Sequence, residues 1–187
     1  FTAILSQIKG LNPDIVLGTG YLNDSVQIVK QMAQVGFSPK VLGFTIATSV
    51  PDFSKSLGAS AEGVIGGEWW EPTYAYTDPV FGSNADFVKL FEQEHGETPP
   101  YYAAAGAQAG VLLQLGIEKA GSLDSDKVRE AILGLDQTTM FGDVKFDETG
   151  VNTKAAPAAS QIIGGAVVPV YPPSAAAGEP IYPKPPF

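Results

Sequence analysis

Short aliphatic runs alternate with helical periodicities along the first seventy residues. The apolar residues of 4–11 recur at helical spacing, and the Asn12-Pro13 pair is expected to end that helix. Three consecutive branched aliphatic residues follow at 15–17, a pattern typical of a strand buried on both faces. Further strands are predicted at 41–45 and 62–70, with intervening helices before Gly36 and at 51–58. This order predicts βαβ units and a mainly parallel sheet.

The end of the first predicted strand is the first candidate for a site. Gly18 and Gly20 follow the aliphatic run, and Tyr21 comes directly after them. Ligands of open α/β sheets bind just beyond the carboxyl ends of the strands, where glycines permit a sharp turn. Tyr21 is therefore either a ligand contact or a tyrosine of the core.

The second half of the chain begins with a tract that has no periodicity. Residues 71–79 contain two prolines and are the candidate for a crossing between lobes. After it, the pattern predicts a helix capped by Asn84, a long helix over 102–120 and a helix capped by Ser122 or Asp124. An exposed strand at 140–146 and a hairpin at 159–171 with a Gly164-Gly165 loop follow. The Pro- and Ala-rich tail from residue 172 is expected to be extended.

Composition narrows the class of protein. The 187 residues are 44% hydrophobic and 17% charged, which is typical of a packed globular protein and excludes a disordered one. No apolar run approaches the roughly 20 residues of a membrane span, so no membrane insertion is expected. A net charge of −9 with only 11 Lys and Arg argues against a nucleic-acid partner. The chain has neither an initiator Met nor a signal-peptide pattern, so a fragment or a processed chain is expected.

The chain lacks the residues that most catalytic sites and metal sites need. The chain has no cysteine and one histidine, His95, at an expected helix end. Thiolate and two-histidine metal sites are therefore impossible, and no GxSxG or P-loop motif occurs. No cofactor is expected. A hydrolase with a carboxylate pair stays open, because the 20 acidic residues allow many pairs.

Aromatic residues are the remaining candidates for a ligand-binding site. The pairs Trp69-Trp70 and Tyr101-Tyr102 stand at an expected strand end and an expected helix start. Adjacent residues of a strand point to opposite faces, so at most one of the tryptophans faces a given cleft. Together with Tyr21 these residues favour a small-molecule cleft over a purely structural role.

Seven blocks in this order resemble the type I periplasmic solute-binding proteins, in particular the branched-chain amino-acid/amide family of ABC transporters. The blocks are FTAILSQIKGLNPDIVLGTGY, VKQMAQVGFSPKVLG, LGASAEGVIGGEWWEP, FVKLFEQEHGETPPYYAAAGAQAG, GIEKAGSLDSDKVREAIL, TTMFGDVKFDETGVN, and the tail from SQIIGG through VVPVYP to YPKPPF. The resemblance implies an α/β fold of two lobes with helices on both faces of parallel sheets, and a chain that lacks the family's N-terminal part. It also implies that residues 1–70 form a second-lobe segment, 71–163 return to the first lobe, and 164–187 form a crossing strand and tail.

The same resemblance implies a ligand site. Tyr21 matches a position whose aromatic side chain contacts the ligand, Tyr102 matches an apolar pocket position, and Trp70 resembles an aromatic residue near the cleft. Thr45 stands where the family often has an acid that pairs with a ligand ammonium. A neutral hydroxyl cannot compensate a buried ammonium. An amide, a carboxylate or an aromatic acid is therefore favoured over an ordinary amino acid, unless Glu68 or Glu71 supplies the charge.

The function expected from this resemblance is binding without catalysis. The chain would belong to the substrate-binding component of an ABC importer, closing its lobes on a small molecule and docking on a membrane permease. Its location would be periplasmic, or extracytoplasmic with a membrane anchor. Two alternatives stay open: an extracellular ligand-sensing domain on the same fold, and an α/β enzyme with a carboxylate pair.

Overall fold

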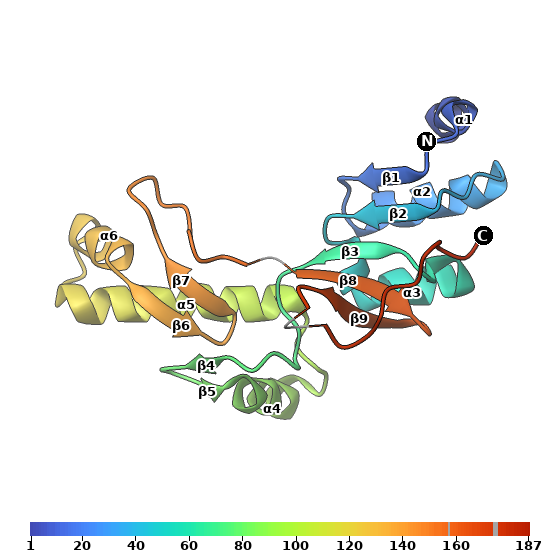
Figure 1. Cartoon of the computed structure of the whole chain (residues 1–187). Coiled ribbons are helices and arrows are strands. Elements are labelled where there is room, and N and C mark those ends of the chain that lie inside the picture. Colours follow the sequence, from blue (N-terminus) through green and yellow to red (C-terminus); the bar gives the residue numbers. More distant parts are fainter. Residues whose placement is uncertain (157, 174–175) are drawn as a thin grey trace. The chain divides into compact units, whose positions relative to one another are not determined.

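The computed structural model describes residues 1–156, 158–173 and 176–187. The chain divides into two compact units (Figure 1). Unit 1 comprises Phe1–Glu68 and Pro157–Phe187, and unit 2 comprises Trp69–Ala156. Unit 2 is thus inserted into the sequence of unit 1.

Unit 1 is built on a sheet in the order β1-β2-β3-β8-β9 within the described residues. Its strands are β1 (Ile15–Gly18), β2 (Val41–Phe44), β3 (Ile65–Glu68), β8 (Ala158–Ile163) and β9 (Ala166–Tyr171). The first three strands are parallel, with Ile15 opposite Val41 and Gly43 opposite Ile65. Strand β8 then pairs antiparallel with β3, and β9 antiparallel with β8. The βαβ units and the hairpin predicted from the sequence are confirmed.

Helices pack on one face of this sheet and form the core of unit 1. They are α1 (Thr2–Leu11), α2 (Leu22–Gln34), α3 (Pro51–Leu57) and the 3₁₀ turns Ala47–Ser49 and Gly58–Ala61. Val29, Leu42 and Phe53 are fully buried members of one core cluster that joins α2, β2 and α3. The expected side-chain cap at Asn23 or Asp24 is absent, because α2 starts at Leu22 and both residues lie inside its first turn; the cap position is the extended Tyr21.

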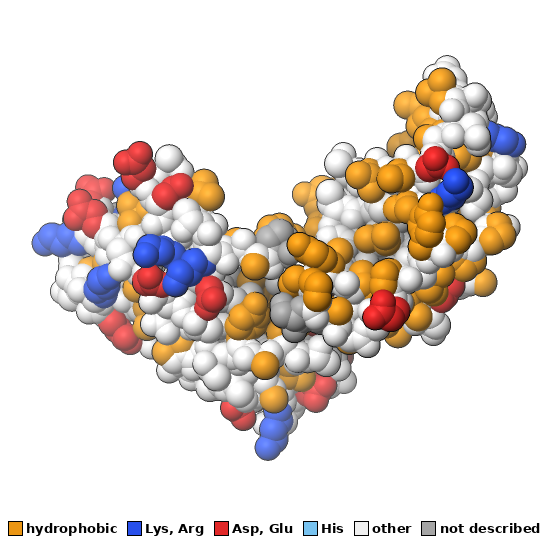
Figure 2. Space-filling model, in the orientation of Figure 1, with side chains coloured by type: hydrophobic (Ala, Val, Ile, Leu, Met, Phe, Trp, Pro, Cys, Tyr) orange, Lys and Arg blue, Asp and Glu red, His pale blue; other side chains and the backbone are white. Residues whose placement is uncertain are grey.

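Strand β1 differs from the strand that its sequence predicts. Ile15 and Leu17 are 59% and 76% exposed, so the aliphatic run is buried on one face only. The physical reason is that Val16 points to the face on which the helices pack, whereas Ile15 and Leu17 point to the opposite face, which no described helix covers; β1 also stands at one edge of the sheet. Figure 2 shows hydrophobic side chains gathered on the surface of unit 1 in this view.

The C-terminal tail is tied to unit 1 by buried polar groups. The Gln161 carboxamide is 1% exposed, donates to the carbonyls of Gly63 and Ile181, and accepts the Ile181 N–H at 2.7 Å. The amide of Lys184 donates to the carbonyl of Lys40, just before β2. Gly63 lies under the tail with φ +75, and a Cβ there would stand 2.7 Å from Lys184 Cγ. The described end of the tail is therefore held against unit 1 by these contacts.

Unit 2 combines three helices with two short hairpins. Its elements are β4 (Thr77–Asp78), β5 (Gly82–Ser83), α4 (Asn84–His95), α5 (Tyr101–Ala120), α6 (Ser125–Leu133), β6 (Asp136–Thr139) and β7 (Gly142–Lys145). The long helix and the strand within 140–146 are confirmed, and Asp124 caps α6 by accepting the Lys127 N–H. Strands β4, β5 and β6 have no counterpart in the sequence-based prediction, because two to four polar residues show no clear alternation.

A buried polar residue, Asn84, organises the core of unit 2. Sequence analysis places Asn84 at a helix cap, but Ser83 is the cap, in a capping box with Asp86. Asn84 is instead 1% exposed and its Nδ2 donates to the carbonyls of Glu71 and Pro72. Its Oδ1 accepts the indole N–H of Trp70 at 3.0 Å. One side chain thus fixes the start of α4, the tract after β3 and the largest aromatic residue of this core.

The chain returns from unit 2 to unit 1 earlier than expected: unit 2 ends at Ala156, whereas the sequence-based boundary is after residue 163. Residues 158–163 were expected to belong with 71–157, but they form β8 and pair with β3 in the sheet of unit 1. The hydrophobic pattern of a strand does not say which sheet it joins. The first boundary, between Glu68 and Trp69, lies two residues from the expected one at 70/71.

Replacing Asn84 tests this polar core. We expect Asn84→Ala to lower the free energy of unfolding by about 2–4 kcal/mol, because two half-buried carbonyls lose their donor and the buried Trp70 indole loses one acceptor. Asn84→Asp keeps the acceptor for Trp70 but removes both donors, and should be destabilising as well. Urea unfolding would measure both variants; a change within about 0.5 kcal/mol would contradict the role assigned to Asn84.

The buried Lys184 predicts a pH dependence. Desolvation lowers the pKa of Lys184 to about 8, and its ammonium lies 3.7 Å from the Phe187 ring centroid. From about pH 8 to the unfolded value of about 10.4, the unfolded chain binds more protons at this residue than the folded one. Its contribution to stability therefore rises with pH across that window.

Lys184→Met should remove that rise and stabilise the protein at pH 7 by about 1–2 kcal/mol. This is less than the full conversion of the pKa difference, because the Phe187 ring compensates part of the charge. Thermal melts of both forms at pH 7 and pH 10 would measure the difference. If the difference in melting temperature between the wild type and Lys184→Met is the same at both pH values, Lys184 keeps an ordinary pKa.

Candidate functional site

The candidate site lies at the carboxyl edge of the parallel strands of unit 1. Strands β1, β2 and β3 run in the same direction, so their last residues share one edge of the sheet. At that edge, Thr45 follows β2 directly, Tyr21 lies three residues after the end of β1, and Glu68 ends β3. Loops at this edge are where open α/β sheets bind ligands. The structure therefore brings two of the four sequence-predicted residues, Tyr21 and Thr45, to one edge.

Close packing of the backbone positions the Tyr21 ring. A Cβ on Gly18 would stand 2.7 Å from the Phe44 ring, so only glycine lets β1 end so close to β2. The carbonyl of Gly20 accepts a hydrogen bond from the fully buried Ser25 hydroxyl at 3.4 Å. The loop is thus held from both sides, while the Tyr21 side chain itself is 74% exposed.

The loop after β2 is fixed by its backbone, which leaves the Thr45 side chain exposed. A Cβ on Gly67 would stand 2.4 Å from the Thr45 carbonyl oxygen, so the two strand ends approach through glycine. The carbonyl of Gly67 also accepts a hydrogen bond from the Ser49 hydroxyl at 3.3 Å. The exposed group that this loop offers is therefore a neutral hydroxyl.

Two acidic residues lie at this edge: Asp24, which is exposed in the first turn of α2 beside Gly20, and Glu68, which ends β3. Glu68 is 1% exposed, and the hydroxyl of Ser160 on β8 donates to its Oε2 at 3.3 Å. This burial distinguishes Glu68 from Tyr21 and Thr45, whose side chains are exposed.

Trp70 occupies a different environment from the one expected of a cleft residue. It is 1% exposed in the core of unit 2, with its ring edge-on to Phe87 at 6.0 Å between centroids. Its N–H donates to Asn84 Oδ1 and to the carbonyl of Met140. Its neighbour Trp69 is 43% exposed. The structure therefore places Trp70 among core residues, as the alternation of adjacent side chains allows.

Tyr102 stands in the first turn of α5 and is 60% exposed. Its ring meets that of Tyr101 edge-on, with 5.7 Å between centroids. Tyr102 belongs to unit 2, whereas Tyr21 and Thr45 belong to unit 1. Its role in ligand binding stays a prediction.

Unit 2 contains two hollows of its own. One is an apolar groove of about 480 Å³ between α5, α6 and the turn after β7, lined by Leu113, Val128, Ile132 and Phe146, with Arg129. The other is a cavity of about 200 Å³ with aromatic and polar walls, including Trp69, Tyr76, Gln108, Phe141 and Lys154. Sequence analysis named only Trp69 among these residues. The others lie on separate elements, and no spacing in the sequence connects them.

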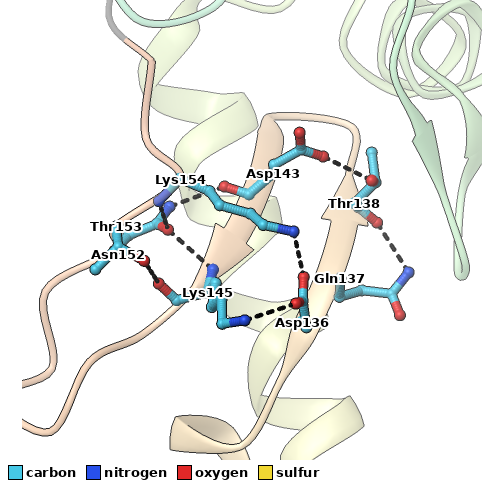
Figure 3. Close-up of polar contacts among 8 residues, drawn as sticks. All are labelled: Asp136, Gln137, Thr138, Asp143, Lys145, Asn152, Thr153 and Lys154. Atoms are coloured by element: carbon cyan, nitrogen blue, oxygen red, sulfur yellow. Dashed lines mark hydrogen bonds and ion pairs between the residues drawn. The ribbon is translucent and has the colours of Figure 1, made fainter.

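Charged side chains gather beside the second hollow, on β6, β7 and the segment after them (Figure 3). Asp136 accepts hydrogen bonds from Lys154 and Lys145, which lower the pKa of its carboxyl below the usual range. The hydrogen bond between Lys154 and Asp136 also raises the pKa of the Lys154 ammonium. Across the described residues, no group of three or more His, Cys, Asp and Glu is arranged to hold a metal ion. No helix among them is long and apolar enough to span a bilayer.

Comparisons with known proteins agree with this architecture. A family model described as "Periplasmic binding protein" matches residues 1–183. "Leu/Ile/Val-binding protein homolog 7" of Brucella abortus (strain 2308) is 27% identical over 191 residues, covering 95% of this chain and 46% of that protein. The crystal structure of a leucine-binding protein from Thermotoga maritima superposes with a TM-score of 0.79 at 27% identity, covering 91% of this chain and 47% of that one.

A structure of a branched-chain amino-acid transporter binding protein from Streptococcus pneumoniae, in complex with isoleucine, superposes with a TM-score of 0.70. At 20% identity, covering 89% of this chain and 46% of that one, it supports the fold alone. The chain spans about half the length of the curated relatives that it matches.

Proposed function

Since the chain belongs to the periplasmic binding protein family, we propose that it is part of the substrate-binding component of an ABC importer. This component binds a small solute outside the cytoplasm and presents it to a membrane permease. Relatives are named as binding proteins for leucine, isoleucine and valine, and solved neighbours as branched-chain amino-acid ABC transporter proteins. These names support a solute-binding role in this chain as well.

The observation that carries the proposal is that two exposed side chains with hydroxyl groups, Tyr21 and Thr45, stand at the same edge of the sheet. Tyr21 offers a ring and a hydroxyl, and Thr45 a hydroxyl, on loops fixed by Gly18 and Gly67. A loop that is rigid while its side chain is exposed loses little entropy when a ligand binds. We propose that Tyr21 stacks on the ligand and that Thr45 hydrogen-bonds to it.

The chemistry of this edge also suggests the class of ligand. The exposed side chain after β2 is neutral Thr45, and the nearby Glu68 is buried against Ser160. A ligand ammonium would find no exposed acid at Thr45, and an uncompensated ammonium is costly to bury. We propose that the preferred solute is a small amide, carboxylate or aromatic acid that needs no acid at this position.

A thermal-shift screen on the full-length protein tests the function itself. The panel contains branched-chain amino acids, amides, short carboxylates and aromatic acids. A ligand at 100 times its dissociation constant should stabilise the protein by about 2.7 kcal/mol, which is a readily measured shift. A best hit among the amides or acids supports the proposal. A best hit such as leucine would keep the solute-binding role but refute the assignment at Thr45, and no hit in any class would count against both.

Tyr21→Ala should weaken binding of the identified solute about tenfold or more, because the ligand loses a large aromatic contact. Tyr182→Ala is a matched control, since Tyr182 is also a tyrosine of unit 1 and is 69% exposed. It lies two residues from Lys184, whose amide binds the carbonyl before β2, at the opposite edge of the sheet. Isothermal titration would measure the affinity of both variants for the solute. Equal affinities would show that Tyr21 does not contact the ligand.

Thr45→Glu places an acid after β2. We expect it to weaken binding of a carboxylate solute and to strengthen binding of an ammonium-bearing analogue of the same size, each by about tenfold. Thr45→Gln is the uncharged control of the same length as glutamate. If both substitutions change both affinities alike, the effect is steric and Thr45 does not set the ligand's charge.

A further inference from the structure

The cavity of about 200 Å³ in unit 2 has the features of a separate binding site. Three aromatic residues contribute to its wall: Trp69, Tyr76 and Phe141. They come from the start of unit 2, the tract before β4 and the β6–β7 turn, so distant segments build one hollow. All its lining residues belong to unit 2, whereas Tyr21 and Thr45 belong to unit 1.

The volume fits one small ring. An apolar cavity of about 150 Å³ is known to hold a benzene molecule, so a cavity somewhat larger holds a ring with one small substituent. Aromatic walls favour such an occupant, because ring pairs in offset or edge-on contact gain about 0.5–1.5 kcal/mol beyond burial. The Tyr76 ring is already set edge-on against Tyr74 at 6.0 Å, which fixes its orientation in the wall.

Charged groups at the cavity are compensated within the chain. Lys154 donates to Asp136, and the Asp143 carboxylate, which accepts the Thr138 hydroxyl at 2.6 Å, lies near enough to Lys154 to help raise the pKa of its ammonium (Figure 3). An ionic ligand would lose its hydration here and would have to compete with these existing partners. The lining therefore favours an uncharged ligand.

Polar groups in the lining indicate what the ring carries. The Gln108 carboxamide lines the cavity and is oriented by its hydrogen bond to the Thr139 hydroxyl at 2.8 Å. A carboxamide has two N–H donors and an oxygen with two lone pairs, so one bond leaves capacity for a ligand. The Asn152 carboxamide also lines the cavity and is held by the amides of Lys145 and Lys154. Groups with both donors and acceptors match an amide or a hydroxyl on the ligand.

We propose that this cavity binds a small uncharged aromatic molecule bearing an amide or a hydroxyl group, independently of the solute site in unit 1. Its ring lies among Trp69, Tyr76 and Phe141, and its polar group meets Gln108. Trp69 is the first residue of unit 2, and Ala155 and Ala156, also in the lining, are its last two. The occupant thus contacts the chain where it enters and where it leaves this unit.

Benzamide is the probe for this site, with phenylacetate and benzylamine as probes of similar size and opposite charges. Isothermal titration into the full-length Tyr21→Ala protein, in which the proposed solute site of unit 1 is weakened, should show saturable binding of benzamide, and binding at least about fivefold weaker for either ion. Tryptophan fluorescence gives an independent readout. Of the two tryptophans in these 187 residues, Trp70 is 1% exposed with a bonded N–H, whereas Trp69 is 43% exposed, so the part of a benzamide-induced change that Trp69→Ala removes reports on the cavity.

Variants locate the binding. Trp69→Ala should weaken benzamide binding about tenfold, and Ala155→Phe should abolish it by filling the cavity. Leu113→Ala, in the groove between α5 and α6, and Tyr21→Ala, in unit 1, should leave it unchanged. Circular dichroism melts check that each variant folds. If Trp69→Ala does not fold, Ala155→Phe and Gln108→Leu decide.

Three results would overturn the proposal. Non-saturable benzamide binding would show that the cavity has no site for this class of ligand. Unchanged affinity in Ala155→Phe would place the binding elsewhere. Loss of binding in Tyr21→Ala would assign benzamide to the solute site of unit 1.

Discussion

Antiparallel pairing of β3 with β8 is the interaction on which the rest of this structure depends. It joins Ile65 to Gln161 and Glu68 to Ala158 across the whole of the inserted unit. Without it, the β8–β9 hairpin would be separated from the parallel strands, and Gln161 would no longer hold the tail against them. Such a non-local pairing carries a loop-closure cost, but that cost grows only slowly with the length of the intervening chain.

The same sheet explains why the candidate solute site lies where it does. Parallel order brings the ends of β1, β2 and β3 to one edge, and glycines at 18 and 67 let the backbones approach so closely that larger residues would collide. The exposed Tyr21 and Thr45 side chains are then carried by fixed loops. Unit 2 meets a different constraint: with a small core, it relies on the buried Asn84 to join α4, the tract after β3 and Trp70.

Particular residues show where reasoning from the sequence reaches its limit. Tyr21 was placed at a strand end by a local pattern, and the structure puts it there with an exposed ring. Trp70 was chosen over Trp69 by resemblance, but the structure buries Trp70 and leaves Trp69 partly exposed in a cavity wall. Two adjacent tryptophans have the same local signal, and only the packing partners decide which of them turns inward. The walls of that cavity could not be predicted, since Tyr76, Gln108 and Lys154 come together only in the folded unit.

The sequence by itself determined the local elements and the family: alternating strands and helices, the Gly164-Gly165 hairpin, the long α5, and the ordered motifs of periplasmic binding proteins. These follow from periodicity and turn chemistry, which act over a few residues. Tertiary structure decided that β1 is an edge strand with Leu17 exposed, that residues 158–163 return to the first sheet, and that Asn84 serves the core instead of a cap. Each of these depends on which distant segment lies opposite, and burial is a property of that pairing and not of the segment alone.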